Sequence, residues 1–287
     1  MFAYKKAFTD KKIDLPSTTT PLTYQQVYDL GKQLATFDGD RITMFGFDYA
    51  DAWVDRIWMN MLAETGDSLY TKDFTKIILT TNDKTKAVVQ YFYNHVKDKL
   101  GAVSSIVASP NWIGDDFDKG IVGLIQYGYW FSAMAESDIT KDQVVMLPAP
   151  TWAGVRRDPC MTATGMVMAA ATKVPDAAWK VFEWYNAEEP ETARATSGWG
   201  VPNIKSQYSL MPNTGFQAQV QTVLKAELDL NTAPLQFNPY LNETTVSNSW
   251  FQYLQQALAG TITFDQMLTN IENDVNSAIQ DGKAAIS

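Results

Sequence analysis

The sequence predicts an α/β fold with added helices toward the C-terminus. In the first part of the chain, apolar runs of strand length alternate with segments whose apolar residues recur at helical spacing. In the last third, three helical patterns follow one another with few strands between them. The chain has 287 residues, of which 46% are hydrophobic and 19% charged, so it is globular and long enough for two domains or one large one.

The first part of the chain predicts alternating helices and strands. The capping box Thr23-x-x-Gln26 marks the start of a helix, and Gly101 is expected to end a later one. The predicted elements are, in order, a helix from residue 24, a strand over 42–47, a helix carrying Trp53 and Trp58, a strand over 76–81, a helix up to 101, and strands over 120–127 and 143–147.

The second part begins with a longer apolar run, residues 160–172, and then a helix with Pro175 in its first turn. The nearest thing to a linker is the segment 231–245. The three C-terminal helices are predicted over residues 215–228, 246–260 and 263–282, the last beginning at a second capping box, Thr263-x-x-Gln266.

Composition excludes several classes of function. The formal net charge is -9 without a basic stripe, so we expect no nucleic-acid partner. A single cysteine, Cys160, excludes an internal disulfide framework and a cysteine-ligated zinc site. No apolar stretch is long enough to span a membrane, and residues 1–12 lack the apolar core of a signal peptide. We expect no cofactor and no metal.

Catalytic motifs are also missing from the sequence. The only histidine, His95, lies in a helical pattern and is expected to be a half-buried helix residue. Acidic clusters occur at Asp38 and Asp40 and at residues 115–118. Paired carboxylates can serve a glycosidase or bind calcium, although solvated loop charges explain them more simply.

Aromatic residues are the distinctive feature, with 9 Trp, 13 Tyr and 14 Phe. Trp130, Trp199 and Trp250 each lie beside a glycine or a chain turn. A ring at the end of an element can present a flat apolar face with polar groups nearby, which suits the C–H face of a sugar. From composition alone, ordinary core packing is the alternative explanation.

Nine short motifs then follow one another in a recognisable order. They are MFAYKKAF (1–8), LPSTTTPLTYQQVYDLGKQL (15–34), DAWVDRIWMNMLAETGDSLY (51–70), TNDKTKAVVQYFYNHV (81–96), DDFDKGIVGLIQYGYW (115–130), VVMLPAP (144–150), MTATGMVMAAAT (161–172), KVPDAAWKVFEWY (173–185) and SGWGVPNIKS (197–206). In this order the chain resembles the extracellular solute-binding proteins of carbohydrate ABC importers, the group that includes maltose-binding protein. Tyr24 stands where that family usually has a tryptophan.

The resemblance implies a two-lobed periplasmic-binding-protein-like fold of type II, with the ligand in the cleft between two α/β lobes. Residues 1–158 would form lobe two, 159–212 would cross a hinge into a partial lobe one, and 213–287 would return to lobe two. The family normally has a signal peptide and roughly a hundred or more further residues of lobe one before the segment matched here. We therefore expect residues 159–212 to be exposed, and either mobile or paired with another copy.

The resemblance also implies a function. The chain would capture a sugar or oligosaccharide outside the cell without catalysis and deliver it to a permease, in a protein held at the membrane only through a lipid anchor that this chain lacks. The matching ligand-binding positions are Trp130, Trp250, Trp58, Trp53 and Trp199, with Tyr129, Tyr49 and Arg156 as weaker candidates. Alternatives are another polar solute such as a sugar acid or polyamine, a glycan-active hydrolase, or a fragment that no longer binds.

Overall fold

The computed structural model describes the whole chain except residues 102–110, 158–164, 231–234, 236, 243 and 287. Within the described residues, one sheet has the strand order β2-β3-β4-β1-β5. Its strands are β1 (Phe2–Tyr4), β2 (Thr36–Asp38), β3 (Arg41–Tyr49), β4 (Val122–Gln126) and β5 (Val144–Met146).

Strand direction brings several strand ends to one edge of this sheet. β3 and β4 are parallel, while β1 is antiparallel to both β4 and β5. β3, β4 and β5 therefore run in the same direction, and their carboxyl ends lie at one edge. In α/β folds this edge is where ligands are usually bound.

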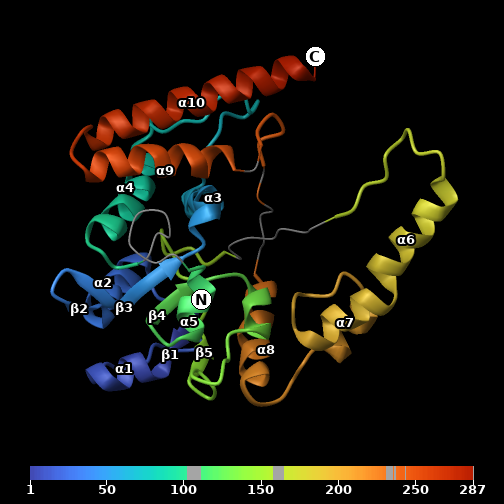
Figure 1. Ribbon diagram of the computed structural model, residues 1–287, viewed down its shortest axis with the longest axis horizontal. Coiled ribbons are helices and arrows are strands. Elements are labelled where there is room, and N and C mark those ends of the chain that lie inside the picture. Colours follow the sequence, from blue (N-terminus) through green and yellow to red (C-terminus); the bar gives the residue numbers. More distant parts are fainter. Residues whose placement is uncertain (102–110, 158–164, 231–234, 236, 243, 287) are drawn as a thin grey trace.

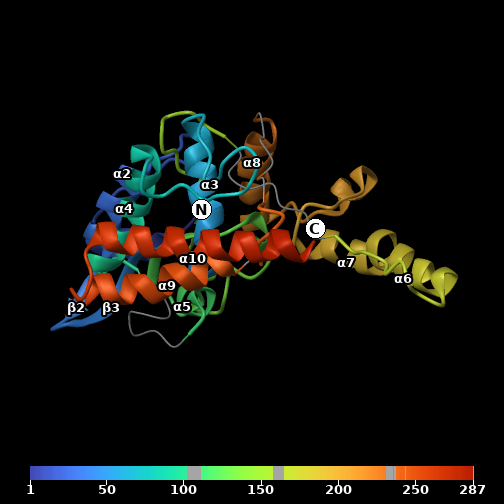
Figure 2. The same ribbon diagram turned by 90° about the horizontal axis from the view of Figure 1, so that it is seen from above.

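Helices cover the sheet and extend the core. They are α1 (Lys5–Lys11), α2 (Tyr24–Leu34), α3 (Val54–Glu64), α4 (Asp83–Lys97), α5 (Ile113–Asp118), α8 (Gly215–Leu228), α9 (Thr245–Leu258) and α10 (Phe264–Ala285), with a short 3₁₀ helix η1 (Asp51–Trp53) before α3. α9 and α10 lie side by side, and α9 packs on α3 (Figures 1 and 2). The C-terminal helices thus belong to the same core as the sheet.

Local predictions from the sequence hold at the helix ends. Both capping boxes form, because the Thr23 and Thr263 side chains accept hydrogen bonds from the backbone N–H of Gln26 and Gln266. Pro175 lies in the first turn of its helix as predicted.

The strand predicted over residues 76–81 is wrong. Only a single bridge between Tyr70 and Ile77 forms there. The Glu272 carboxylate of α10 accepts hydrogen bonds from the backbone N–H groups of Leu79 and Thr80, both at 2.7 Å. Because a side chain 192 residues or more away satisfies these donors, the segment is fixed against α10 without joining the sheet.

His95 is fully buried, and not half-buried as expected. Its Nε2 lies 2.6 Å from the carbonyl oxygen of Phe47, which can only accept, so this nitrogen carries the proton. Nδ1 has no hydrogen-bond partner among the described residues. Burial lowers the pKa of His95 to about 4, since a charged imidazolium would lose its hydration there.

An arm of the chain stands apart from this body, formed by α6 (Pro175–Ala187), α7 (Glu189–Ser197) and the 3₁₀ helix η3 (Lys205–Leu210) (Figures 1 and 2). The first residues of the apolar run predicted over 160–172 lie outside the described part. Residues 165–172 form no strand and are largely exposed, and α6 has no buried residue. The expectation that this region is exposed is therefore confirmed for residues 165–187, whereas Glu191 and Ala195 of α7 are buried. In the described part of the chain, no helix combines the length and apolarity needed to cross a membrane.

Candidate functional site

Four aromatic residues from three separate segments meet at the carboxyl edge of the sheet: Trp112, Tyr127, Trp130 and Trp199. We refer to them as the aromatic cluster. Trp130 is its centre, with ring centroids 6.2 Å from Trp112, 5.4 Å from Tyr127 and 5.4 Å from Trp199. Phe131 lies fully buried beneath, 5.9 Å from Trp130. The cluster therefore rests on the core on one side and reaches solvent on the other.

Trp130 is positioned by the end of β4 and by α8. After β4, Gly128 leads into the 3₁₀ helix η2 (Tyr129–Ala133). A Cβ atom on Gly128 would lie 2.8 Å from the Trp130 indole, so only glycine allows the ring to fold back over the chain. Gln217 of α8 donates a hydrogen bond to the Ser132 carbonyl at 2.7 Å and holds this turn in place.

Trp112 directly precedes α5 and is 40% exposed. Its ring lies over Gly114, where a Cβ atom would overlap the indole. It is nearly parallel to Trp130, at 16°, and stacks on Tyr127 with centroids 5.6 Å apart. These contacts hold the two indoles in one orientation and leave part of each ring open to solvent.

Trp199 comes from the arm, just after Gly198 ends α7 in a left-handed conformation. It is 47% exposed and meets Trp130 at an angle of 53°. A residue of the arm is therefore in direct ring contact with Trp130.

Carboxylates stand beside the aromatic cluster. Burial is the main cause that raises the pKa of the Tyr127 hydroxyl far above its usual value, and the negative charges of Asp48 and Asp51 add to it. Asp48 is a fully buried residue of β3, the strand parallel to β4, and Asp51 follows the end of that strand. Asp51 is partly exposed and accepts a hydrogen bond from the N–H of Ala52 at 2.7 Å. The site thus combines flat apolar rings with acceptor oxygens.

Three residues predicted to bind ligand are in the core. Trp58 of α3 and Trp250 of α9 are fully buried and pack edge to face against each other, with centroids 5.3 Å apart. Tyr49 is fully buried at the end of β3, between Phe92 and His95. None of the three offers a free ring face in this structure, because α9 packs on α3 around the two tryptophans and Tyr49 is enclosed between β3 and α4. All three side chains are part of the hydrophobic core.

The remaining predicted residues lie near the surface but outside the aromatic cluster. The Tyr129 hydroxyl accepts a hydrogen bond from Gln221 of α8 at 2.9 Å, so this ring faces α8. Trp53 is exposed, with the Arg56 guanidinium 5.5 Å from its ring. Arg156 donates to the Glu227 carboxylate at 2.8 Å.

The sequence analysis missed Trp112, Tyr127 and Asp51. Trp112 satisfies the same criterion that selected Trp130, since it precedes a helix and has a glycine two residues on. Tyr127 is the last residue of the strand predicted over 120–127, and Asp51 comes shortly after the strand predicted over 42–47. These two residues can be selected only once the strand order is known, because that order brings the carboxyl ends of β3 and β4 to the same edge of the sheet.

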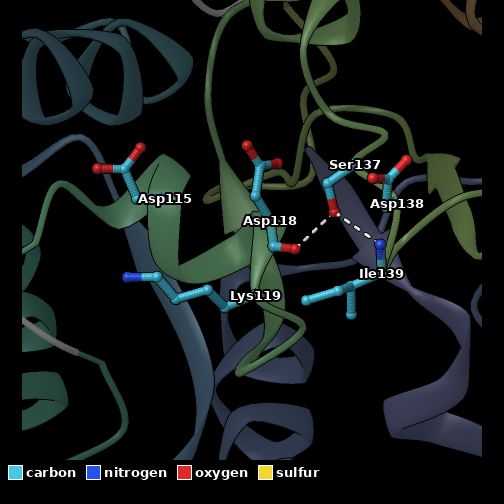
Figure 3. A pocket seen from close by; sticks show the side chains of 6 residues that line it. All are labelled: Asp115, Asp118, Lys119, Ser137, Asp138 and Ile139. Atoms are coloured by element: carbon cyan, nitrogen blue, oxygen red, sulfur yellow. Dashed lines mark hydrogen bonds between the residues drawn. The ribbon is translucent and has the colours of Figure 1, made fainter.

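The acidic cluster at residues 115–118 lies toward the opposite, amino end of β4. There Asp115, Asp118, Lys119, Ser137, Asp138 and Ile139 line an open depression of about 430 Å³ (Figure 3). Burial and the charge of Asp115 raise the pKa of Asp118 to about 6. Figure 3 shows the carboxylates as separate groups along the rim. Across the described residues, no group of three or more His, Cys, Asp or Glu side chains could hold a metal ion.

No protein-family model matches the chain, and no curated protein matches it significantly. Solved structures do match its fold. An ABC substrate-binding protein from Listeria monocytogenes, in complex with cycloalternan, has a TM-score of 0.73 and 15% identity over 97% of this chain and 69% of its own. An ABC transporter solute-binding protein from Thermotoga lettingae bound with α-D-tagatose has a TM-score of 0.70 and 14% identity over 97% of this chain and 69% of its own.

A third similar structure is the cyclic α-maltosyl-1,6-maltose binding protein from Arthrobacter globiformis. It has a TM-score of 0.61 and 18% identity, over 98% of this chain and 69% of its own. At these identities the likeness establishes the fold. The chain has a partial solute-binding-protein fold in which one lobe is largely missing, and the fold class predicted from the sequence is confirmed.

Proposed function

We propose that this chain is the non-catalytic sugar-binding component of an ABC import system, and that the aromatic cluster is where the ligand stacks. The observation that carries the proposal is the cluster itself: Trp112, Trp130 and Trp199 converge at the carboxyl edge of the sheet.

The chemistry of the aromatic cluster favours a carbohydrate. A pyranose ring has one apolar face of C–H groups that stacks on an indole, while its hydroxyls need acceptors and donors at the edge. The exposed parts of Trp112 and Trp199 supply the first, and the partly exposed carboxylate of Asp51, which follows β3, would supply the second. Similar structures that hold cycloalternan, α-D-tagatose or D-mannitol support this ligand class.

The fold supports a role in transport. In the proposed organisation, residues 1–158 and 213–287 form lobe two and residues 159–212 cross toward lobe one. Trp199 contacts Trp130 from the crossing segment, so a ligand stacked on the exposed faces of both rings would couple the two lobes. The proposed partner is the permease of the importer, and the proposed location is outside the cytoplasmic membrane, with anchoring as a lipoprotein in the complete protein.

Titration calorimetry with a panel of sugars tests the proposal. Cycloalternan, maltose, mannobiose and D-mannitol represent the ligands named for similar structures. The Trp130→Ala variant is expected to bind the best of these more weakly by about 1–3 kcal/mol, the range for loss of one aromatic stacking partner. Trp184→Ala, an exposed tryptophan on α6, is the matched control and should bind as the unmodified chain does.

Unchanged affinity in Trp130→Ala would refute the assignment of the aromatic cluster, whereas no binding of any sugar would refute the ligand class. The same mixtures analysed by chromatography distinguish a hydrolase, which would release products. A sugar acid or a polyamine, added as further ligands, tests the other polar solutes.

A further inference from the structure

We propose that Glu64 and Glu227 are positioning residues for the aromatic cluster. Their carboxylates hold residues 149–157, through which the chain first leaves the body for the arm, and so set the orientation in which Trp199 of the arm meets Trp130. We call residues 149–157 the first crossing. The inference deepens the function proposed above and rests on it where sugar affinity is concerned, but the contact between the two rings can be measured without any ligand.

Glu64 fixes the middle of the first crossing. It is the last residue of α3 and is 6% exposed. Its Oε2 accepts hydrogen bonds from the backbone N–H groups of Trp152 at 2.8 Å and Ala153 at 3.0 Å. Burial raises the pKa of Glu64, and these two hydrogen bonds and the charge of Arg157 oppose that rise without cancelling it. The buried carboxylate therefore depends on the backbone of the first crossing for its partners.

Glu227 joins the two ends of the first crossing. This residue of α8 is also 6% exposed, and its Oε1 accepts hydrogen bonds from the Ala149 N–H at 3.1 Å and from the Arg156 guanidinium at 2.8 Å. Gly154 lies between these two residues with a φ of 75°, and a Cβ atom there would meet nothing within 4 Å. The left-handed glycine lets the chain turn back, so that both ends reach the same oxygen.

Further contacts tie the first crossing to α2 and α4. The Thr151 N–H donates to the Leu22 carbonyl at 2.8 Å, and the Thr151 carbonyl accepts from the Tyr24 N–H at 2.9 Å. The Trp152 ring packs against the rings of Tyr24 and Tyr91, with centroids 6.2 Å and 5.8 Å away. The first half of the crossing is thus part of the body, and the carboxylates decide the direction in which the chain leaves it.

The second crossing, residues 211–214, is held less firmly. Its residues are partly or fully exposed, and the Met211 N–H donates back into the arm, to the Tyr208 carbonyl, at 3.3 Å. Gly215, where α8 begins, is exposed with a φ of 55°, and a Cβ atom there would meet nothing within 4 Å. Because an uncrowded glycine beside exposed chain turns easily, the first crossing is what fixes the arm.

The ring contact that depends on this arrangement is small. The centroids of Trp199 and Trp130 are 5.4 Å apart, and Trp199 is 47% exposed. The arm otherwise stands away from the body, with α8 between the arm and the sheet in both views (Figures 1 and 2). A shift of the first crossing by a few ångströms would therefore separate the two rings and divide the aromatic cluster.

Circular dichroism tests the inference without ligand, because two indoles in contact give an exciton band that separated indoles do not. The part of the band due to Trp199 is the difference between a chain and its Trp199→Ala counterpart. That difference should largely disappear in Glu64→Ala and remain in Glu64→Gln, whose side-chain oxygen still accepts from both N–H groups. Arg156→Gln, which changes only a partly exposed partner of Glu227, should reduce the band too and decides the question if Glu64→Ala does not fold.

Glu272→Ala is the matched control. It removes another carboxylate that accepts from two backbone N–H groups, those of Leu79 and Thr80, but both lie in the body and away from the crossing. Its Trp199 band should equal that of the unmodified chain. Equal loss of the band in Glu64→Ala and Glu272→Ala would overturn the inference, because it would reflect general loosening of the fold.

An unchanged band in both Glu64→Ala and Arg156→Gln, or no Trp199 band in the unmodified chain, would overturn the inference as well. Sugar affinity gives a second readout. Glu64→Ala should weaken binding of the best sugar about 5-fold or more when Trp199 is present, and should have no effect in the Trp199→Ala background. Equal weakening in both backgrounds would contradict a positioning role. No binding of any sugar would refute the proposed function, and the circular dichroism would still decide the inference.

Discussion

Acid should destabilise this protein through His95 in a way that can be calculated from its surroundings. The imidazole is fully buried against Phe47 and Tyr49, and its Nε2 donates to the Phe47 carbonyl at 2.6 Å. Burial lowers its pKa from 6.5 to about 4. In the unfolded chain the pKa returns to about 6.5, so between these values the unfolded state binds more protons.

The difference between the folded and unfolded pKa values of His95 sets the sign and the size of the change in unfolding free energy with pH. Stability is highest above pH 6.5 and falls as the pH is lowered toward 4, because protons then favour the unfolded chain. The two pKa values predict a loss of about 3 kcal/mol between pH 7 and pH 4, most of it above pH 5. Asp118, whose pKa is raised to about 6, acts in the opposite sense, so the contribution of His95 has to be measured by comparison with a variant that lacks it.

Urea unfolding at several pH values, followed by tryptophan fluorescence, measures the effect. His95→Gln keeps an N–H donor for the Phe47 carbonyl but does not titrate. The variant also loses packing contacts, and this loss is the same at every pH. The measured quantity is therefore the unfolding free energy of the unmodified protein minus that of His95→Gln, followed as a function of pH. That difference should shrink by about 3 kcal/mol from pH 7 to pH 4, while contributions from Asp118 and the other carboxylates cancel. Parallel stability curves for the two proteins would refute the reasoning.

Two further predictions concern the body of the fold and use denaturant unfolding at neutral pH. Gly46→Ala should lower the unfolding free energy by at least about 3 kcal/mol, because its Cβ would overlap the Gly31 carbonyl where α2 packs on β3. Gly165→Ala, whose Cβ meets nothing, is the control, and equal losses in the two variants would contradict this explanation. Glu272→Ala should cost about 2–4 kcal/mol because it leaves backbone donors unpaired. Glu272→Gln should cost about half as much, and no difference between these two would show that the carboxylate is unimportant.

Some features of this protein were determined by the sequence alone because the interacting groups are neighbours along the chain. The two capping boxes join residues three positions apart, and the helices that follow were placed correctly from local spacing. The turn that presents Trp130 depends on Gly128 two residues earlier, so this residue could also be found. The order of weak motifs was enough to predict the fold class.

Tertiary structure decided which tryptophans are core and which are surface. Trp250 lies beside a chain turn as Trp130 does, but α9 packs on α3 and encloses the rings of Trp58 and Trp250. Tyr127, directly after β4, and Asp51, after β3, come to the same edge of the sheet only because β3 and β4 are parallel and adjacent. Similarly, residues 76–81 have the sequence pattern of a strand, but the Glu272 carboxylate of α10 accepts the hydrogen bonds of two of their backbone N–H groups. These outcomes depend on contacts between residues far apart in the chain, which no local pattern encodes.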